Sequence, residues 1–177
     1  MTELDSRCLE AFPNWLRTLG EDARALGALV ESESNPEAVR RSATLALNYL
    51  FKSLDLIPDG IEDLGFIDDA FVFRVAAAKA ASDGAAEATV TRLAADVSLI
   101  RDFLADDFAR LESYVASLAG ASARGRSVDD IMGDATVRTE FVREVRAWAD
   151  GYSEPSFQRD AKNLVKLKSF LSAKLPK

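Results

Sequence analysis

The sequence predicts an all-α fold: a single domain over residues 1–177, built as a bundle of about seven helices. Helix breakers are scarce, with 9 glycines and 5 prolines in 177 residues. No stretch alternates apolar and polar residues in the way of a half-buried strand. Apolar residues instead recur at intervals of three and four along most of the chain, which is the period of an amphipathic helix.

The first two predicted helices meet at a proline. Residues 3–12 form a short helix after the N-cap Thr2, and Pro13 starts a second helix, since proline suits the first turn better than the interior. The second helix carries an apolar stripe formed by Trp15, Leu16, Leu19, Ala23, Leu26 and Val30. A third helix begins after the N-cap Asn35 and reaches about Ser53.

The longest predicted helix is amphipathic and covers about residues 86–119. Its apolar residues step by three or four throughout: Val90, Leu93, Val97, Ile100, Leu104, Phe108, Leu111, Val115 and Leu118. This pattern is typical of a helix with one face in a core, with a break near Asp106 left open. Because no clear charge pattern flanks the stripe, we prefer a core helix to a coiled-coil dimer. Two shorter helices follow, at about 128–132 and 136–150.

The last predicted helix, about residues 156–174, is basic in an acidic chain. Residues 158–177 carry a local charge of +5, whereas the whole chain carries −7. The cations on one side of the helix are Arg159, Lys162, Lys166, Lys174 and Lys177. Such a helix can make weak contact with an anionic membrane surface. A helix that closes the bundle and leaves its lysines in water explains the same pattern, and we prefer it.

Composition argues against several classes of function. Phosphate backbones repel a chain of net charge −7, so we expect no nucleic-acid partner. The chain has no histidine, which removes Ser-His and Cys-His nucleophile pairs and histidine metal ligands. Cys8 is the single cysteine, so no intrachain disulfide can form. Because neither a signal peptide nor a spanning segment is apparent, we expect a cytoplasmic location.

Residues 53–69, SLDLIPDGIEDLGFIDD, place six carboxylates between two apolar segments and predict a helical hairpin. Pro58 presets the backbone of a turn and forces Ile57 out of the helical region, so the preceding helix must end by Leu56. Asp55 and Asp59 can accept hydrogen bonds from the amides of the turn and of the next helix start.

Asp68 is the least expected residue of this stretch. If residues 61–75 are helical, Asp68 shares a face with Leu64 and Phe71, which places a carboxylate on an apolar seam. A buried carboxylate must be paired or hydrogen-bonded, or its pKa rises. The candidate partners are a cation, the turn amides of residues 55–60, and the side chains of Arg40, Arg41, Asn48 and Lys52.

Clustered carboxylates can also bind Mg²⁺ or Ca²⁺. The candidate metal ligands are Asp55, Asp59, Asp68 and Asp69. The EF-hand pattern fails: with Asp55 at position 1, Ile57 stands at position 3 and Phe66 at position 12. Adjacent helical residues also point about 100° apart, so Asp68 and Asp69 are not expected to reach one ion. We therefore prefer capping and ion pairing to a metal site, and we expect no catalytic residues and no cofactor.

The same stretch matches a known signature, S-P-I-D-L-I-P-D-x-I-P-x-x-G-x-x-D-D between two hydrophobic segments. The residues in register are Asp55, Leu56, Ile57, Pro58, Asp59, Ile61, Gly65, Asp68 and Asp69, and the core of the motif is Asp55, Pro58, Asp59, Gly65, Asp68 and Asp69. Residues 40–80 thus resemble the bacterial domain of unknown function 1232 (YkvA-like) family. The chain departs from the signature at Lys52-Ser53 and at Glu62. The resemblance implies a shared helical hairpin and no reaction, because none is established for the family.

Two classes of function are compatible with the sequence. The preferred one is a non-enzymatic interaction or scaffold protein with an unknown protein partner, which predicts a contiguous exposed apolar patch. Peripheral membrane contact through the last helix is left open within this class. The alternative is a divalent-cation-binding enzyme or sensor, which predicts that at least three of Asp55, Asp59, Asp68 and Asp69 converge on one point. The sequence favours no enzymatic activity and does not indicate the oligomeric state.

Overall fold

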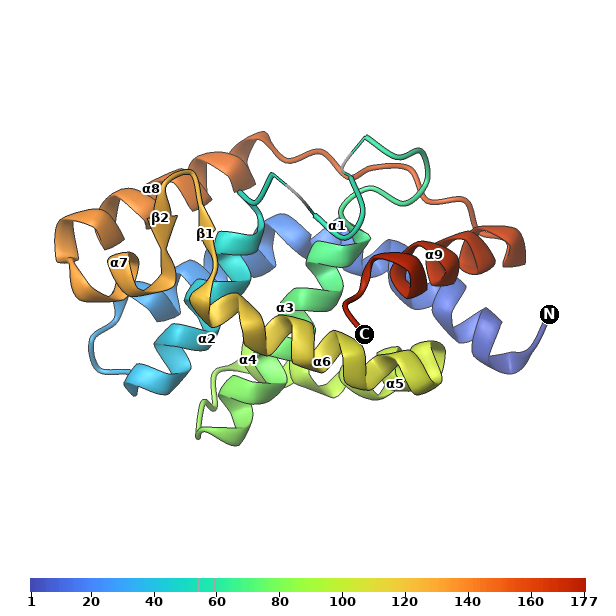
Figure 1. Cartoon of the computed structure of the whole chain (residues 1–177), viewed down its shortest axis with the longest axis horizontal. Helices are drawn as coiled ribbons and strands as arrows, with labels where there is room; N and C mark the ends of the chain where they lie inside the picture. The colour runs from blue at the N-terminus through green and yellow to red at the C-terminus, as the bar shows by residue number, and fades with distance from the viewer. Residues whose placement is uncertain (54, 59) are drawn as a thin grey trace.

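The computed structural model of the chain describes residues 1–53, 55–58 and 60–177 and confirms the all-α fold (Figure 1). Its helices are α1 (Glu3–Glu31), α2 (Glu37–Tyr49), α3 (Ile67–Ser82), α4 (Ala88–Ala95), α5 (Val97–Leu104), α6 (Phe108–Ser117), α7 (Val128–Gly133), α8 (Ala135–Gly151) and α9 (Ala161–Lys174). Two 3₁₀ turns are η1 (Ala105–Asp107) and η2 (Leu118–Gly120), and two short antiparallel strands are β1 (Ser122–Ala123) and β2 (Arg126–Ser127).

Helix α1 runs along the length of the molecule and continues through Pro13 (Figure 1). The predicted cap is present, because Thr2 Oγ1 accepts a hydrogen bond from Asp5 N at 3.0 Å. The prediction that Pro13 starts a new helix is wrong. Phe12 and Trp15, on either side of the proline, are both buried in one core. This packing outweighs the local cost of an interior proline, about 3 kcal/mol.

Helices α2 and α3 pack against each other and form the predicted hairpin, joined by residues 50–66, which we call the 50–66 loop. Helix α2 is shorter than predicted, since it ends at Tyr49. Asn35 is not its cap: the Asn35 amide donates to Leu29 O at 3.2 Å, and Pro36 occupies the N-cap position. Residues 61–66 form turns, so the helix that was assumed over residues 61–75 is present only from Ile67, where α3 begins.

The predicted long helix of residues 86–119 is divided into α4, α5 and α6. The sharp break lies at Ala105, whose φ of 50° and ψ of −118° are incompatible with a helix, and it confirms the break that was left open near Asp106. The predicted apolar stripe is nevertheless buried along all three helices, and none of its nine residues is more than 6% exposed. Hydrophobic periodicity predicted the buried face, but it carries no signal for a single residue with positive φ.

Replacing Ala105 with glycine is expected to raise the free energy of unfolding by about 1 kcal/mol, because glycine adopts positive φ without the penalty that alanine incurs. Urea unfolding measures the change. Ala109→Gly is the matched control: Ala109 lies in regular helix on the exposed side of α6, so this change is expected to cost about 1 kcal/mol. A loss of equal size in both variants would contradict the assignment of strain to Ala105.

The last helix begins at Ala161, five residues later than predicted, after an irregular segment that leads from α8. Asp160 caps it, accepting a hydrogen bond from Asn163 N at 2.9 Å. The inner face is buried at Leu164, Leu167, Leu171 and Leu175, and the exposed cations are Arg159, Lys162, Lys166, Lys168, Lys174 and Lys177. The apolar face of α9 therefore closes the bundle.

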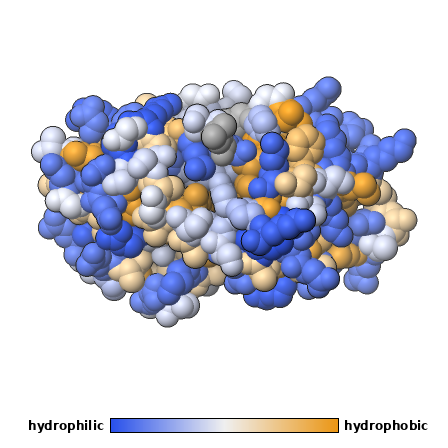
Figure 2. All heavy atoms as spheres, viewed as in Figure 1, coloured by the Kyte–Doolittle hydropathy of each residue, from blue (hydrophilic) through white to orange (hydrophobic). Residues whose placement is uncertain are grey.

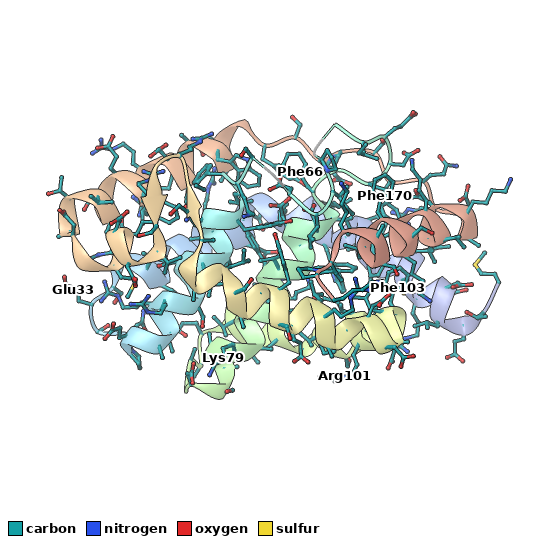
Figure 3. The ribbon with its side chains drawn as sticks, in the orientation of Figure 1. Glu33, Phe66, Lys79, Arg101, Phe103 and Phe170 are labelled. Atoms are coloured by element: carbon teal, nitrogen blue, oxygen red, sulfur yellow. The ribbon has the colours of Figure 1, made fainter. Side chains whose placement is uncertain are left out.

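The centre of the core is an aromatic cluster of Phe12, Trp15, Phe71 and Phe103, whose ring centroids lie 5.0–6.2 Å apart (Figure 3). Hydrophilic residues dominate the face shown in Figure 2, with apolar side chains between them. In the described part of the chain, the large hydrophobic side chains that are exposed are Met1 and Val165. None of the helices there is both long and apolar enough to cross a bilayer.

Candidate functional site

Three aspartates converge where the 50–66 loop meets the start of α3. One carboxylate oxygen from each of Asp55, Asp68 and Asp69 lies within 4.8 Å of the others. Asp68 and Asp69 are 0% and 1% exposed, and Asp55 is partly buried. We call these residues the aspartate cluster. The fourth predicted ligand, Asp59, lies outside the described residues.

The expectation that Asp68 and Asp69 cannot reach one point is wrong. Both lie in the first turn of α3, where the Cα–Cβ bonds tilt toward the N-terminus of the helix. First-turn side chains can therefore reach back toward the chain that enters the helix, and Asp55 in the 50–66 loop meets them there. The positive end of the helix dipole also favours carboxylates in this turn.

The start of α3 is fixed by Phe66 immediately before it. Phe66 has a φ of 66°, a left-handed conformation, and follows the buried Gly65. Its ring lies edge-on to the rings of Trp148 and Tyr152, with centroids 5.9 and 5.6 Å away (Figure 3). These contacts with α8 and the residue after it hold the turn that aims Asp68 and Asp69 at the loop.

Tyr49 connects Asp68 to the backbone of the loop. Its hydroxyl donates to Asp68 Oδ2 at 2.6 Å and accepts from Leu56 N at 2.8 Å. Ile57 N donates to the same oxygen of Asp68 at 3.3 Å. The predicted role of turn amides as partners of Asp68 is thus confirmed. Sequence reasoning missed Tyr49, because nothing in its spacing distinguishes it from another core aromatic at the end of a helix.

Two of the basic side chains proposed as partners for Asp68, those of Arg40 and Arg41, form hydrogen bonds elsewhere. Arg40 donates to Val30 O at 3.1 Å, and Arg41 forms a 2.6 Å ion pair with Asp129 on α7. Asn48, also proposed, donates to the backbone of β2. Asp68 is buried, as its predicted position on the apolar seam requires, although α3 begins at Ile67 and not at residue 61.

Helix α9 lies beside the 50–66 loop (Figure 1) and donates two hydrogen bonds to its backbone. Asn163 Nδ2 donates to Asp63 O at 3.0 Å, and Lys166 Nζ donates to Glu62 O at 3.1 Å. One cation of the basic helix therefore supports the loop that carries Asp55. Contact of the remaining cations of α9 with an anionic membrane stays a prediction, which flotation with liposomes tests.

The aspartate cluster places three carboxylates close to the tyrosines of the chain. Burial, followed by Asp68 and Asp69, raises the pKa of Tyr49 far above its usual value. Burial together with Asp55, Asp68 and Asp69 raises the pKa of Tyr114 to about 12. The pKa of Tyr152 is raised too, and burial is the largest cause. The surroundings of the cluster thus disfavour any further negative charge.

These shifts predict an alkaline transition. Above pH 10 an unfolded tyrosine loses its proton while the folded one keeps it, so the folded state binds more protons and stability falls as the pH rises. At pH 11 about a tenth of Tyr114 side chains should be ionised, against about nine tenths in the unfolded chain. Phenolate absorbance measures this, with the chain in urea as the control. Native tyrosines that titrate near pH 10 would contradict the prediction.

Cys8 offers no second site. It is fully buried in α1, and burial raises the pKa of its thiol to about 11, so the thiolate form is scarce at neutral pH. A buried thiol of this kind behaves as a small hydrophobic side chain.

Comparison with known proteins places the aspartate cluster inside a recognised segment. Residues 39–74 match the model of a family described as "Protein of unknown function (DUF1232)". The match covers most of α2, the 50–66 loop and the first half of α3, so it includes Tyr49 and the three aspartates. It confirms the resemblance noted for residues 40–80. No curated protein and no solved structure matches the chain.

Proposed function

We propose that this protein binds a divalent cation, Ca²⁺ by preference, through Asp55, Asp68 and Asp69, and that the ion ties the 50–66 loop to α3. The carrying observation is the approach of three carboxylate oxygens to within 4.8 Å of one another. Oxygens on opposite sides of a Ca²⁺ ion are about 4.8 Å apart, since Ca–O distances are about 2.4 Å. Mg²⁺ usually keeps several of its waters and is seldom held by protein ligands alone, so a buried group of three carboxylates favours Ca²⁺.

The burial of the cluster supports a cation. Asp68 and Asp69 are almost completely withdrawn from water, and like charges in one place raise each other's free energy. Hydrogen bonds from Tyr49 and from the backbone of Ile57 stabilise one oxygen of Asp68. A divalent ion would offset the repulsion among the three carboxylates and bind Asp55 and α3 together.

The proposal replaces the interaction-protein hypothesis as the preferred function. That hypothesis predicted a contiguous apolar patch, and the large exposed hydrophobic side chains of the described residues, Met1 and Val165, are isolated near the first residue and on α9. The cation hypothesis predicted that at least three aspartates converge on one point, and Asp55, Asp68 and Asp69 fit that requirement. We assign a binding role without a reaction, as expected of a sensor whose loop responds to the ion.

Thermal unfolding tests the proposal. The melting temperature in EDTA is compared with that in Ca²⁺, Mn²⁺ and Mg²⁺. An ion at a concentration 100 times its Kd stabilises the folded state by about 2.7 kcal/mol, or about 5–11 °C for a domain of this size. We expect the largest shift with Ca²⁺. Identical melting in EDTA and in all three ions would refute the proposal.

A further inference from the structure

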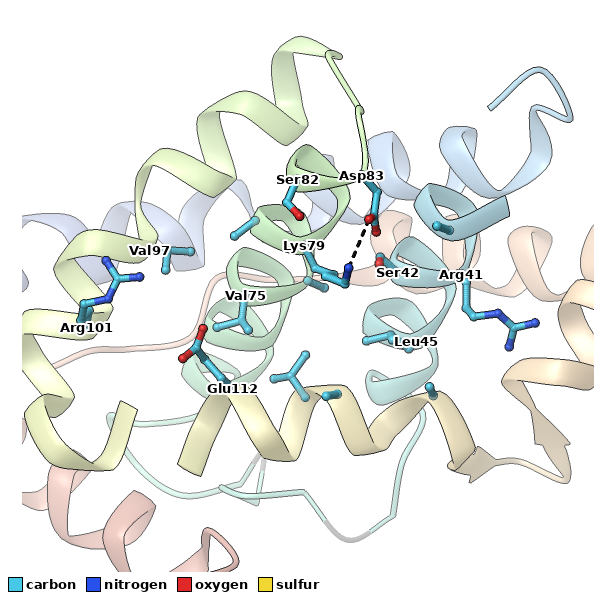
Figure 4. A pocket seen from close by; sticks show the side chains of 16 residues that line it. Arg41, Ser42, Leu45, Val75, Lys79, Ser82, Asp83, Val97, Arg101 and Glu112 are labelled. Atoms are coloured by element: carbon cyan, nitrogen blue, oxygen red, sulfur yellow. Dashed lines mark hydrogen bonds and ion pairs between the residues drawn. The ribbon is translucent and has the colours of Figure 1, made fainter. Parts of the chain in front are cut away.

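A groove with an apolar floor opens between α2, α3, α5 and α6, away from the aspartate cluster (Figure 4). Its volume is about 540 Å³. This volume falls within the range of about 300–1,000 Å³ that is usual for pockets that bind small molecules. A stable protein interface is a different kind of surface, broad enough to bury about 800 Å² on each partner. The size of the groove therefore favours a small molecule over a protein helix.

The floor of the groove is aliphatic. Leu45, Val75, Val97 and Val115 contribute to it from four helices, and each is less than 9% exposed. Alanines of α2, α3 and α6 form the walls, which leaves a channel between the helices without large side chains to fill it. A surface of this kind gains free energy by covering an alkyl chain.

The rim carries charges of both signs. Lys79 forms a 3.1 Å ion pair with Asp83, and Arg41 pairs with Asp129 outside the groove. Arg101 and Glu112 differ from these residues. The Arg101 guanidinium lies 4.9 Å from the ring of Phe108, and within the described part of the chain neither Arg101 nor Glu112 has an ion-pair partner.

Arg101 on α5 and Glu112 on α6 face the groove from the same end, beside Val97 and Val75 (Figure 4). A head group with one negative and one positive charge complements this pair. A purely anionic head group meets Glu112, and a purely cationic one meets Arg101, so either leaves a like charge at the rim.

We propose that this groove binds a single-chain zwitterionic amphiphile, with its alkyl chain on the aliphatic floor, its anionic group at Arg101 and its cationic group at Glu112. The proposal is independent of the aspartate cluster, because the groove lies at the C-terminal half of α3 and the aspartates lie at its start.

Isothermal titration calorimetry with alkyl betaines below their micelle concentrations tests the proposal. Affinity should rise about fourfold per methylene along the octyl, decyl and dodecyl series while the floor is being covered. Dodecanoate and dodecyltrimethylammonium, with single charges, should bind at least about tenfold more weakly than dodecyl betaine. Equal affinity for the three head groups, or no binding of any betaine, would overturn the proposal.

Variants locate the site. Arg101→Glu should weaken dodecyl betaine binding about tenfold or more, and adding Glu112→Arg should restore it to within about threefold, because the charges are exchanged. Arg143→Glu, at an exposed arginine of α8, makes the same change in net charge and should leave binding intact. Ala116→Trp should block the groove, with Ala147→Trp on α8 as its control. Binding that survives both Arg101→Glu and Ala116→Trp would place the ligand elsewhere.

Discussion

Replacing Arg74 with alanine is expected to lower the free energy of unfolding by about 3–5 kcal/mol. The side chain is 0% exposed although it is a guanidinium. Its Nε donates to Asp96 at 3.0 Å, its Nη1 donates to Ala70 O at 3.1 Å, and its charged carbon lies 4.2 Å from the centre of the Trp15 ring. Burial lowers the pKa of Arg74 to about 10, which leaves it charged at neutral pH.

The alanine variant would leave a cavity beside α3 and remove the cation that pairs with Asp96. Lost packing and lost charge pairing therefore both contribute to the fall in stability. Arg74→Met keeps most of the side-chain volume and should lower the free energy of unfolding by less than Arg74→Ala. The difference between the two variants separates the contribution of packing from that of charge. Urea unfolding of both variants measures them, with Arg143→Ala on the exposed side of α8 as the control. A loss below about 1 kcal/mol for Arg74→Ala would show that α3 does not depend on this network.

Arg74 matters for the site because it anchors the helix that presents Asp68 and Asp69. It lies on the same helix, at the last residue of the segment that matches the family model. If α3 shifts, the approach of the three carboxylates is lost. Arg74→Ala should therefore also weaken the cation-dependent rise in melting temperature, whereas Arg143→Ala should leave it unchanged.

The second large effect concerns Asp69→Asn, whose change in the free energy of unfolding should have opposite signs in EDTA and in Ca²⁺. In EDTA this variant should be more stable than the natural chain, by about 1–2 kcal/mol. The oxygens of these carboxylates lie within 4.8 Å of one another. Two unit charges at that separation repel each other by about 3.5 kcal/mol at an effective dielectric constant of 20, and the amide removes this term. At a Ca²⁺ concentration 100 times Kd, the natural chain gains about 2.7 kcal/mol that the variant lacks, so it becomes the more stable of the two.

Asp106→Asn is the control for this comparison, because Asp106 is exposed on η1 and undergoes the same change of charge. Its stability relative to the natural chain should be the same in EDTA and in Ca²⁺. If Asp69→Asn is destabilised by the same amount under both conditions, Asp69 is a structural hydrogen-bonding residue and the cluster does not hold an ion.

Much of the fold could be predicted from the sequence, because it depends on patterns that a helix imposes. The stripe from Val90 to Leu118 is buried throughout, and the Thr2 cap is present. The errors lie where one residue acts against its local preference. Pro13 is held inside α1 by packing on both sides, and Ala105 adopts a positive φ within a stretch of good helix formers.

The site was predicted in part. The burial of Asp68 followed from its position on an apolar face, and it is observed although residues 61–66 form turns and α3 begins at Ile67. The convergence with Asp55 depends on how the 50–66 loop folds back, and the role of Tyr49 depends on where α2 ends. Neither the fold of this loop nor the end of α2 leaves a periodic pattern in the sequence, so both became visible only in the structure. The groove beside Arg101 likewise combines four helices that are far apart in the sequence.

Equilibrium dialysis against Ca²⁺ is the most direct measurement of the proposed site. At about 1 mM free Ca²⁺ the natural chain should retain one ion per molecule. The Asp55→Asn/Asp68→Asn/Asp69→Asn variant, once circular dichroism has shown that it is folded, should retain none. An ion-free natural chain, or a triple variant that still holds one ion, would contradict the assignment of a cation site to the aspartate cluster.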